Sequence, residues 1–246
     1  MFSSTTLIEN NLSDKELCLT FDDGHGVPSF IGNFGPKTLE LAQYLQEQEI
    51  VATFFMVGKQ IIKYPEITKK ISELGHIIGH HTTTHPDLVK FWKAGLDLIP
   101  EFSHTEELIK NYTFNNSIYF RPPHGKWNDS ICNHVNKEFK TKYNYYGPIG
   151  WNIDACDWMY WSKIGTKSAS KCAEAYLKTI QLKKKGIILM HDSTANKKYL
   201  PTLFRKLNNK TLETVKIIVP KLKNEGYKFI SLENIEFNAP LLVCTV

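Results

Sequence analysis

Short apolar runs recur along the chain, and five of them end in residues with chemically reactive side chains. The five ends carry, in order, Asp22-Asp23, His80-His81 with His85, Arg121 with His124, Asp154 with Asp157, and His191-Asp192. Apolar runs are typical of parallel strands that are buried on both faces. In α/β barrels the chemistry lies at the carboxyl ends of such strands. We therefore expect the five ends to meet in one active site.

The segments between these runs have the apolar spacing of helices. Pro65 suits the first turn of one helix, and Gly75 would end it. Helices are expected near residues 37–45, 65–75, 104–112, 129–139, 168–182 and 212–226, and strands near 17–21, 51–57, 77–79, 118–120, 149–153, 187–190 and 228–232. Alternating strands and helices indicate a parallel sheet. About seven such units predict an α/β protein with a closed or nearly closed barrel.

The length and composition fit one folded domain. The chain has 246 residues, 42% of them hydrophobic and 22% charged, which are close to globular averages. No Gly/Ser linker, low-complexity stretch or internal repeat divides it. A single domain over residues 1–246 is expected, with its motif-bearing core at about 15–235.

The charge and cysteine patterns argue against several classes of protein. The net charge is only +5, and apart from residues 183–185 and 197–198 the lysines are spread out. The sequence has no basic stripe that would indicate a nucleic-acid partner. Its slightly positive net charge weakly favours an anionic glycan. The five cysteines form no CxxC pair, so neither a cysteine zinc site nor a disulfide framework is expected.

The first residues lack the basic region and long apolar run of a signal peptide. No apolar stretch approaches the ~20 residues of a membrane span. The chain as given is therefore expected to act in the cytoplasm, or to be secreted or held at the cell surface if a leader has been trimmed. A monomer is expected.

The spacing of His81 and His85 suggests a metal site. Residues i and i+4 of one helical turn share a face, but Thr82 to Thr84 disfavour a helix, so a short turn after the strand is expected. Neighbours on an extended segment point to opposite sides, so His81, and not His80, is the expected ligand. A His-His-Asp set with open positions is a catalytic geometry, for which zinc is the default and cobalt, manganese or iron also suit. Unrelated loop histidines are the alternative.

The motifs together resemble those of the polysaccharide deacetylases, also known as the NodB-homology domain or carbohydrate esterase family four. In order, the matching segments are Thr20-Phe21-Asp22-Asp23-Gly24, His81-Thr82-Thr83-Thr84-His85, Arg121-Pro122-Pro123-His124-Gly125, Asp154-Ala155-Cys156-Asp157-Trp158 and Leu189-Met190-His191. They span most of the chain. Each motif is weak alone, but the ordered set is highly specific.

The resemblance implies a distorted (β/α)7-8 barrel and metal-dependent removal of acetyl groups from N-acetylated sugars. It makes Asp22 the catalytic base and His191 the catalytic acid. It makes Asp23, His81 and His85 the metal ligands. Arg121 would orient Asp22, and Asp157 would support Arg121 or His191. Pro123-His124 would bind the oxyanion through the His124 N–H, and Trp158 and Leu189 would form the pocket for the acetyl methyl. Zn²⁺ is the expected ion, with Co²⁺ as the alternative.

Three positions depart from the family pattern. His25 stands where proline is usual, His80 where asparagine is usual, and His124 where tyrosine is usual. The loop from His25 to Pro36 is also longer than usual. The departures at His25 and His80 are expected to alter the rim of the cleft, whereas His124 should matter least because its backbone N–H carries the role.

Three functions are compatible with these residues. The leading hypothesis is an N-deacetylase that releases acetate from N-acetylglucosamine residues of chitooligosaccharide, chitin or peptidoglycan-type glycans. The alternatives are a related metal-dependent amidohydrolase or esterase on a small acyl compound or O-acetylated glycan, and a glycan-binding module with a degenerate site. Trp151 and Trp161 are expected to pack in the core or at its rim, with sugar stacking as the alternative.

Overall fold

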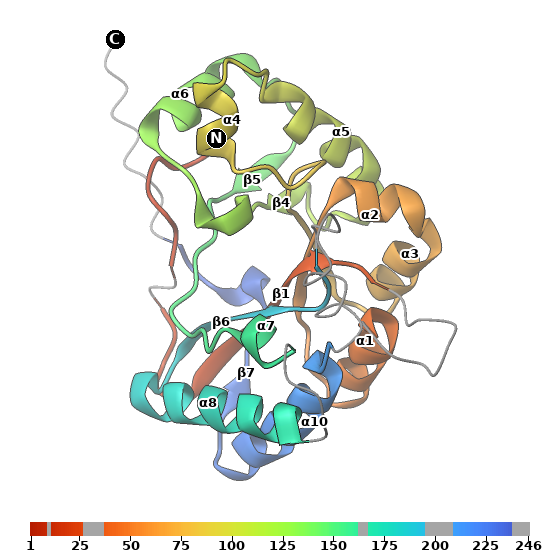
Figure 1. Cartoon of the computed structure of the whole chain (residues 1–246), viewed down its shortest axis with the longest axis vertical. Helices are drawn as coiled ribbons and strands as arrows, with labels where there is room; N and C mark the ends of the chain where they lie inside the picture. The colour runs from red at the N-terminus through yellow and green to blue at the C-terminus, as the bar shows by residue number, and fades with distance from the viewer. Residues whose placement is uncertain (9–10, 27–36, 162–166, 195–208, 238–246) are drawn as a thin grey trace.

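A parallel sheet forms the centre of the molecule (Figure 1). Strand β1 (Glu16–Gly24) pairs with β2 (Thr53–Met56) on one side and with β6 (Gly186–His191) on the other, and β3 (Ile77–His80) continues the sheet beside β2. The short β7 (Lys228–Phe229) pairs with the first residues of β1. This computed structural model describes residues 1–8, 11–26, 37–161, 167–194 and 209–237.

The remaining parallel segments close the sheet into a ring. Strands β4 (Ser117–Tyr119) and β5 (Asn144–Tyr146) pair in parallel. Isolated parallel bridges join β3 to the end of β4, through His80 and Phe120, and join the segment after β5 to β6, through Ile153 and Ile188. The expected strand near Gly150 is thus present only as single bridges. The result is a distorted α/β barrel, as predicted.

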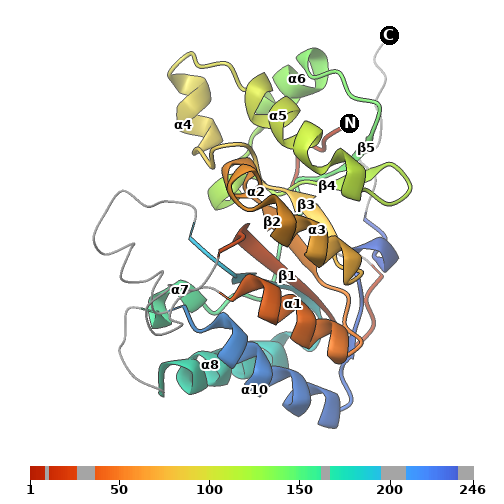
Figure 2. The same ribbon diagram turned by 90° about the vertical axis from the view of Figure 1, so that its right-hand side faces the viewer.

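Helices surround this ring. They are α1 (Thr38–Glu47), α2 (Gly58–Lys63), α3 (Pro65–Glu73), α4 (Leu88–Lys93), α5 (Ile99–Ile109), α6 (Asp129–Glu138), α7 (Asp157–Tyr160), α8 (Lys167–Lys183) and α10 (Thr211–Asn224), with 3₁₀ turns η1 (Lys110–Tyr112), η2 (Pro123–Gly125) and η3 (Leu232–Asn234). Figure 2 shows α1, α8 and α10 together at one end of the molecule, and α4, α5 and α6 at the other. The six expected helices are present, with boundaries that differ by up to five residues.

Strand β1 shows why the chain folds around its first apolar run. Leu17, Leu19 and Phe21 are fully buried on one face, and Cys18 and Thr20 are fully buried on the other. A strand paired on both sides and covered on both faces needs such a continuous run. The Thr20 hydroxyl is satisfied because it donates a 2.7 Å hydrogen bond to the Ile188 carbonyl. The strand is therefore rigid where it delivers the two aspartates that follow Phe21.

The N-terminal segment packs against the barrel. Phe2 is 5% exposed and lies among aromatic rings, with centroids 4.8 Å away for Tyr145, 5.2 Å for Phe120 and 5.4 Å for Phe102. Such aromatic pairs contribute about 0.5–1.5 kcal/mol each beyond their area burial. Further along, Leu7 forms a parallel bridge with Ile149, close to the site described below.

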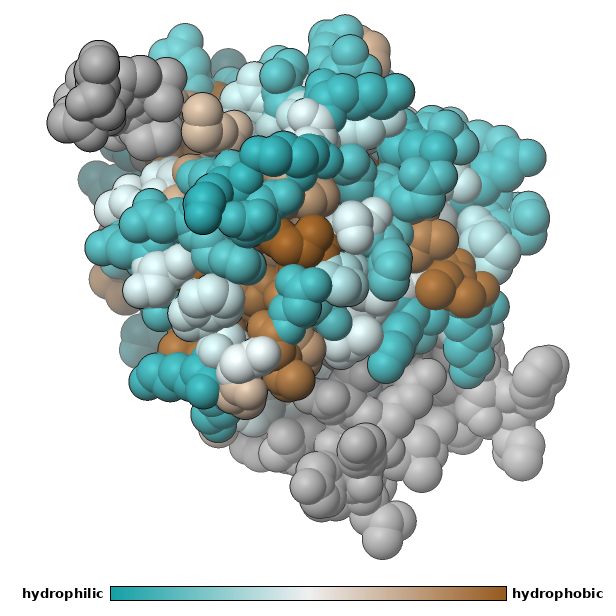
Figure 3. All heavy atoms as spheres, turned by 90° about the horizontal axis from the view of Figure 1, so that it is seen from above, coloured by the Kyte–Doolittle hydropathy of each residue, from teal (hydrophilic) through white to brown (hydrophobic). Residues whose placement is uncertain are grey.

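In the part of the chain that the structure describes, no helix combines the length and apolarity needed to cross a bilayer. Figure 3 shows a mainly hydrophilic face with small, separate hydrophobic patches. Scattered exposed apolar side chains of this kind are normal for a globular protein.

Candidate active site

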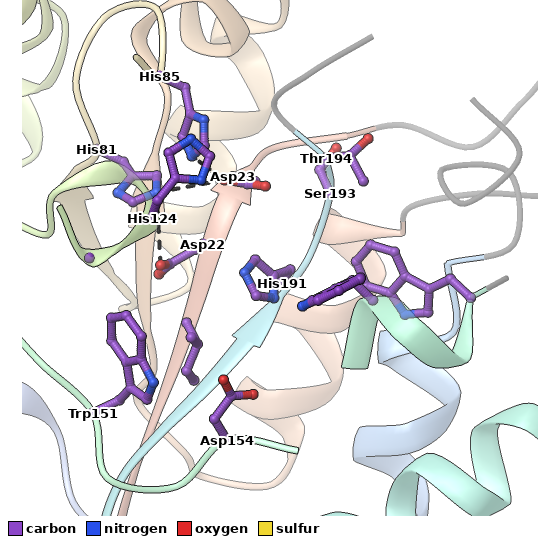
Figure 4. A pocket seen from close by; sticks show the side chains of 14 residues that line it. Asp22, Asp23, His81, His85, His124, Trp151, Asp154, His191, Ser193 and Thr194 are labelled. Atoms are coloured by element: carbon purple, nitrogen blue, oxygen red, sulfur yellow. Dashed lines mark ion pairs between the residues drawn. The ribbon is translucent and has the colours of Figure 1, made fainter. Parts of the chain in front are cut away.

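The carboxyl ends of the strands meet at one cavity of about 420 Å³ (Figure 4). A cavity of this size is typical of small-molecule sites. Eight of the predicted site residues line it: Asp22, Asp23, His81, His85, His124, Trp158, Leu189 and His191. The structure thus brings residues from all five motifs to one place. Arg121 and Asp157 lie behind the wall and act on lining residues, as described below.

Asp23, His81 and His85 form a compact donor set. One ligand atom from each lies within 4.8 Å of the others. Asp23 Oδ1 is 2.9 Å from His85 Nε2 and 3.6 Å from His81 Nε2. One carboxylate and two imidazoles suit a divalent transition metal, and three protein ligands leave a position open for catalysis. Of the neighbouring histidines His80 and His81, only His81, the predicted ligand, faces this set.

The hydrogen bond behind His81 fits the metal role. His81 Nδ1 lies 2.7 Å from the Arg121 carbonyl oxygen, which can only accept, so Nδ1 carries the hydrogen. In the neutral ring this leaves the lone pair of Nε2 facing Asp23. Metal-binding histidines usually donate their other N–H to such a carbonyl, which fixes the ring. The residues present therefore fit a divalent ion.

The electrostatics of the donor set agree with this assignment. Burial alone would raise the pKa of Asp23, but the nearby His85 and His81 outweigh it and hold that pKa well below its ordinary value. Burial would likewise lower the pKa of His85, yet Asp23 raises it overall. Metal ligands must bind deprotonated, so protons compete with the ion at His85. Asp23 is charged and ready to bind across the neutral pH range.

Asp22 is held by a buried guanidinium. Arg121 is 0% exposed, and its Nη1 donates 2.7 Å to Asp22 Oδ1 and 2.8 Å to Thr20 Oγ1. Its Nε and Nη2 donate to the carbonyls of Ile149 and Gly150, each at 3.1 Å. All three nitrogens of the guanidinium donate hydrogen bonds, which fix the group in one geometry. The guanidinium therefore holds the Asp22 carboxylate in a fixed position, and this contact supports the predicted role of Arg121.

His191, the last residue of β6, is held by Asp157. The His191 ring donates from Nδ1 to Asp157 Oδ1 at 2.8 Å, and its backbone N–H donates to Asp157 Oδ2 at 2.7 Å. Burial opposes the charged ring, but Asp157 outweighs it and raises the pKa of His191 to about 10. Of the two supporting roles expected for Asp157, the structure shows contact with His191. The imidazolium presents Nε2 to the cavity.

His124 follows the buried Pro123 in η2 with a left-handed backbone, φ 58°. Within the described residues, the backbone N–H of His124 donates no hydrogen bond. The N–H groups of Gly125 and Lys126 donate to the carbonyls of Pro122 and Pro123. The ring of His124 lies 4.6 Å from that of His85, edge to face. This ring contact places His124 next to the Asp23–His81–His85 set, and the role of its N–H as oxyanion donor stays a prediction.

Five of the ten non-glycine residues with a left-handed backbone, counted over the described residues, lie in the motifs. Asp23, Thr82, His85, His124 and Cys156 have φ values between 53° and 73°. This conformation is uncommon outside glycine, and it costs energy that the surrounding structure must offset. Such residues concentrate at active sites and ligand clamps. The left-handed residues at the ends of the strands are therefore consistent with a functional site there.

Two of the three departures from the family pattern do not reach the cleft. His25 is fully buried, and its Nε2 bonds the Thr68 hydroxyl at 3.0 Å. His80 is fully buried as well, with Nε2 3.1 Å from the Phe102 carbonyl and Nδ1 accepting from the Thr82 N–H. The expectation that they alter the rim is wrong, because both rings point into the packed interior.

His124 is the departure that borders the cavity, since it is exposed and lines it. Burial, as the largest cause, lowers the pKa of its ring. Its ring therefore borders the cavity, while the expectation that only its backbone N–H carries the role stays a prediction. The longer loop up to Pro36 lies for the most part outside the described residues.

The sequence did not assign roles to several cavity residues. Asp154 lines the cavity, and burial raises its pKa. Trp151 is half-buried, whereas Trp161 is 1% exposed; both line the cavity, so each packs and borders the site at once. Ser193 and Thr194 also line it, and among the described residues their buried hydroxyls have no hydrogen-bond partner. Their place directly after His191 was the available signal.

The fold and the site together define a barrel protein with a metal-binding Asp-His-His set beside an Asp–Arg pair and a His–Asp pair. A family model described as "Polysaccharide deacetylase" matches residues 9–142, which is more than half of the chain. The protein belongs to the polysaccharide deacetylase family.

Known relatives agree with this assignment. The chain is 29% identical over 224 residues to a peptidoglycan-N-acetylglucosamine deacetylase of Bacillus cereus, which covers 89% of this chain and 70% of the relative. It is 27% identical over 225 residues to a chitooligosaccharide deacetylase of Rhizobium leguminosarum bv. trifolii, at 91% and 93% coverage. Among solved structures, the polysaccharide deacetylase Bc1974 from Bacillus cereus superimposes with a TM-score of 0.64 at 26% identity, covering 89% of this chain and 93% of the other.

Proposed function

We propose that this protein is a metal-dependent N-deacetylase that hydrolyses the acetamide of N-acetylglucosamine residues in chitooligosaccharide or peptidoglycan-type glycans and releases acetate. The observation that carries the proposal is one cavity that holds the Asp23–His81–His85 donor set together with both oriented pairs, Asp22–Arg121 and His191–Asp157. The relatives named above act on N-acetylated glycans of these two kinds.

The metal set would hold a divalent ion, which we propose to be Zn²⁺ with Co²⁺ as the alternative. When bound, such an ion polarises the acyl carbonyl and makes water a stronger nucleophile near neutral pH. Asp23, His81 and His85 would hold it, and Asp22 would stay free for proton transfer. Imidazole and carboxylate ligands suit both ions.

Asp22 acts as the general base in this proposal. Its Oδ1 is taken by Arg121 at 2.7 Å, so Oδ2 is left to accept the proton of the attacking water. Oδ2 lies 3.8 Å from His81 Nε2, which places it at the edge of the donor set. A base positioned in this way typically contributes 10²–10⁴-fold to the rate.

In this proposal the backbone N–H of His124 stabilises the oxyanion that forms when water adds to the carbonyl. It is a fixed donor beside the donor set, so it needs no reorganisation when charge develops. Loss of one such donor typically costs about 10²–10³-fold in kcat. Leu189 and Trp158 wall the same cavity and would receive the acetyl methyl group.

His191 supplies the proton that the leaving amine needs. Its raised pKa keeps the ring protonated near neutral pH, and Nδ1 is tied to Asp157, so the proton on Nε2 is the one available to substrate. Once that proton has moved to the nitrogen of the sugar, the C–N bond breaks and acetate and the free amine remain.

Asp157→Asn is expected to lower the pKa of His191, because the amide lacks the charge that raises it. The acid must be protonated, so kcat/KM falls as pH rises through this pKa. The alkaline limb of the kcat/KM profile should therefore move to lower pH in the variant than in the wild-type enzyme. An alkaline limb at the same pH as in the wild type would show that Asp157 does not set the pKa of the catalytic acid.

A related esterase or amidohydrolase could use the same residues on other acyl groups. Acetate release from chitooligosaccharides, peptidoglycan and acetylated xylan distinguishes these functions. We expect release from at least one of the first two and little from acetylated xylan. Preferential release from xylan would favour the esterase, and glycan binding without any release would favour a non-catalytic module.

A further inference from the structure

Asp192 carries a buried carboxyl group to which neither the motifs nor the proposed reaction gives a role. It directly follows His191, the proposed acid, and is only 1% exposed. It does not line the catalytic cavity, although His191 and Ser193, on either side of it in the sequence, do. A carboxyl group is costly to bury unless it is hydrogen-bonded. A buried one at this position is therefore expected to have a specific partner.

The backbone of Asp192 extends the pairing of β6 with β1 by one residue. In this ladder Asp22 lies opposite His191. The Asp192 N–H then donates a 3.2 Å hydrogen bond to the Asp22 carbonyl. The proposed base and the proposed acid are therefore neighbours on two paired strands, and the contacts of Asp192 bear on how these strand ends sit relative to each other.

The carboxyl group of Asp192 packs directly on Gly24, the residue that follows Asp23. A Cβ added at Gly24 would lie 2.4 Å from Asp192 Oδ2, 2.6 Å from Oδ1 and 2.9 Å from Cγ. Real Cβ atoms are essentially never found this close to another heavy atom, so the carboxyl group occupies the space that a side chain at position 24 would need. Gly24 does not have a positive φ. This contact, and not the backbone conformation, therefore requires glycine here.

Thr38, the first residue of α1, also holds the carboxyl group. It is fully buried, and its hydroxyl donates 2.7 Å to Asp192 Oδ2 and accepts 3.0 Å from the Gly26 N–H. One carboxyl group thus joins the end of β6, the turn that leaves β1 and the start of α1. Among the described residues Oδ1 has no hydrogen-bond partner, and burial raises the pKa of Asp192 to about 8. The group is therefore mainly neutral at pH 7.

We propose that Asp192 is a positioning residue of the active site, whose carboxyl group fixes the chain after Asp23 against the strand that carries His191. Asp23 has a left-handed backbone, φ 73°, and such a conformation persists only where the surrounding structure holds it. A shift at Gly24 would turn Asp23 away from the other two metal ligands. The inference rests on the proposed function, because Asp192 touches no substrate and acts only through Asp23 and His191.

Asp192→Ala removes the carboxyl group and leaves the Thr38 hydroxyl without its acceptor. Loss of a group that orients a metal ligand costs 10–100-fold in metal affinity or activity, so we expect Zn²⁺ affinity and kcat each to fall about tenfold. KM should not change, because Asp192 does not line the cavity. Asp192→Asn is neutral and keeps the shape and the acceptor, so it should retain both values. Thr38→Val removes the hydroxyl and should lower both values in the same direction.

A pair of substitutions tests the contact itself. Gly24→Ala places a methyl group where the carboxyl group lies, and we expect it to lower Zn²⁺ affinity and kcat more than Asp192→Ala does. In Gly24→Ala/Asp192→Ala the methyl group has room, so the double variant should recover part of both losses. Non-additivity of this kind is the signature of two residues in contact.

Asp14→Ala is the matched control, because Asp14 is exposed and does not line the cavity. It should behave as the wild type does, and thermal unfolding should show that the variants are folded. Wild-type Zn²⁺ affinity and kcat in Asp192→Ala, or a double variant no better than Gly24→Ala, would overturn the positioning role. A lower Tm as the sole effect would make Asp192 merely structural. Absence of acetate release by the wild-type enzyme would instead overturn the proposed function, and the Zn²⁺ titrations would still test Asp192.

Discussion

Replacing His191 by alanine is expected to lower kcat by about 10²–10⁴-fold, the usual contribution of a positioned general acid, and to leave metal binding intact. His191 is outside the Asp23–His81–His85 set, and its ring is tied to Asp157. Without it, the amine has no proton donor when the C–N bond breaks. The measurement combines kcat on an N-acetylglucosamine oligomer with the metal content of the purified variant.

His104→Ala is the control for this substitution, because His104 is exposed on α5 and away from the cavity. It should retain wild-type kcat. Wild-type turnover by His191→Ala would remove His191 from the acid role. Loss of the metal from that variant would place His191 in the metal set and would require a new assignment of the site.

Replacing Asp23 by asparagine is expected to remove both metal and turnover. Asparagine accepts the left-handed backbone of this position, φ 73°, better than alanine does. The change therefore isolates the loss of charge. Substitution of an outer partner of a metal ligand already costs 10–100-fold in metal affinity, so loss of a charged ligand should cost more than about 100-fold.

Metal affinity is measured by titration with Zn²⁺, and kcat is measured at saturating metal. Asp14→Asn is the matched control, since Asp14 is exposed and does not line the cavity. Asp14→Asn should bind metal and turn over as the wild type does. Full metal occupancy in Asp23→Asn at the wild-type affinity would contradict the ligand assignment.

The chemistry at the ends of the strands could be predicted because it depends on local sequence and on parallel topology. Each reactive residue follows an apolar run by at most a few positions, and parallel strands present their carboxyl ends on one edge. The alternation of side chains along an extended segment was enough to choose His81 over His80. These arguments need no knowledge of distant contacts.

Other features could not be predicted, because they depend on contacts between residues that are far apart in the sequence. The burial of His25 depends on Thr68 in α3, and that of His80 depends on Phe102 in α5. Neither partner is near in the sequence, so exposure at the rim was the wrong expectation. Helices α2, α4 and α7 have only four to six residues, too few for the apolar periodicity that reveals longer helices.

A smaller cavity of about 200 Å³ beside the active site was equally hidden, because its lining residues come from three separate parts of the chain. Thr6 comes from the N-terminal segment, Pro122 from the third motif and Trp151 from the stretch before the fourth. Weighed alone, Trp151 was more simply explained by packing. Only the folded structure shows that it packs against Arg121 and borders two hollows at once.

Acetate release from a chitin tetramer by enzyme stripped of metal with a chelator, and then titrated with Zn²⁺, tests the central claim most directly. We predict no release from the stripped enzyme, and recovery of activity that saturates at one equivalent of metal. Wild-type release by the metal-free enzyme, or no release at any metal concentration from either tetramer or peptidoglycan, would contradict the assignment of this cavity as a metal-dependent deacetylase site.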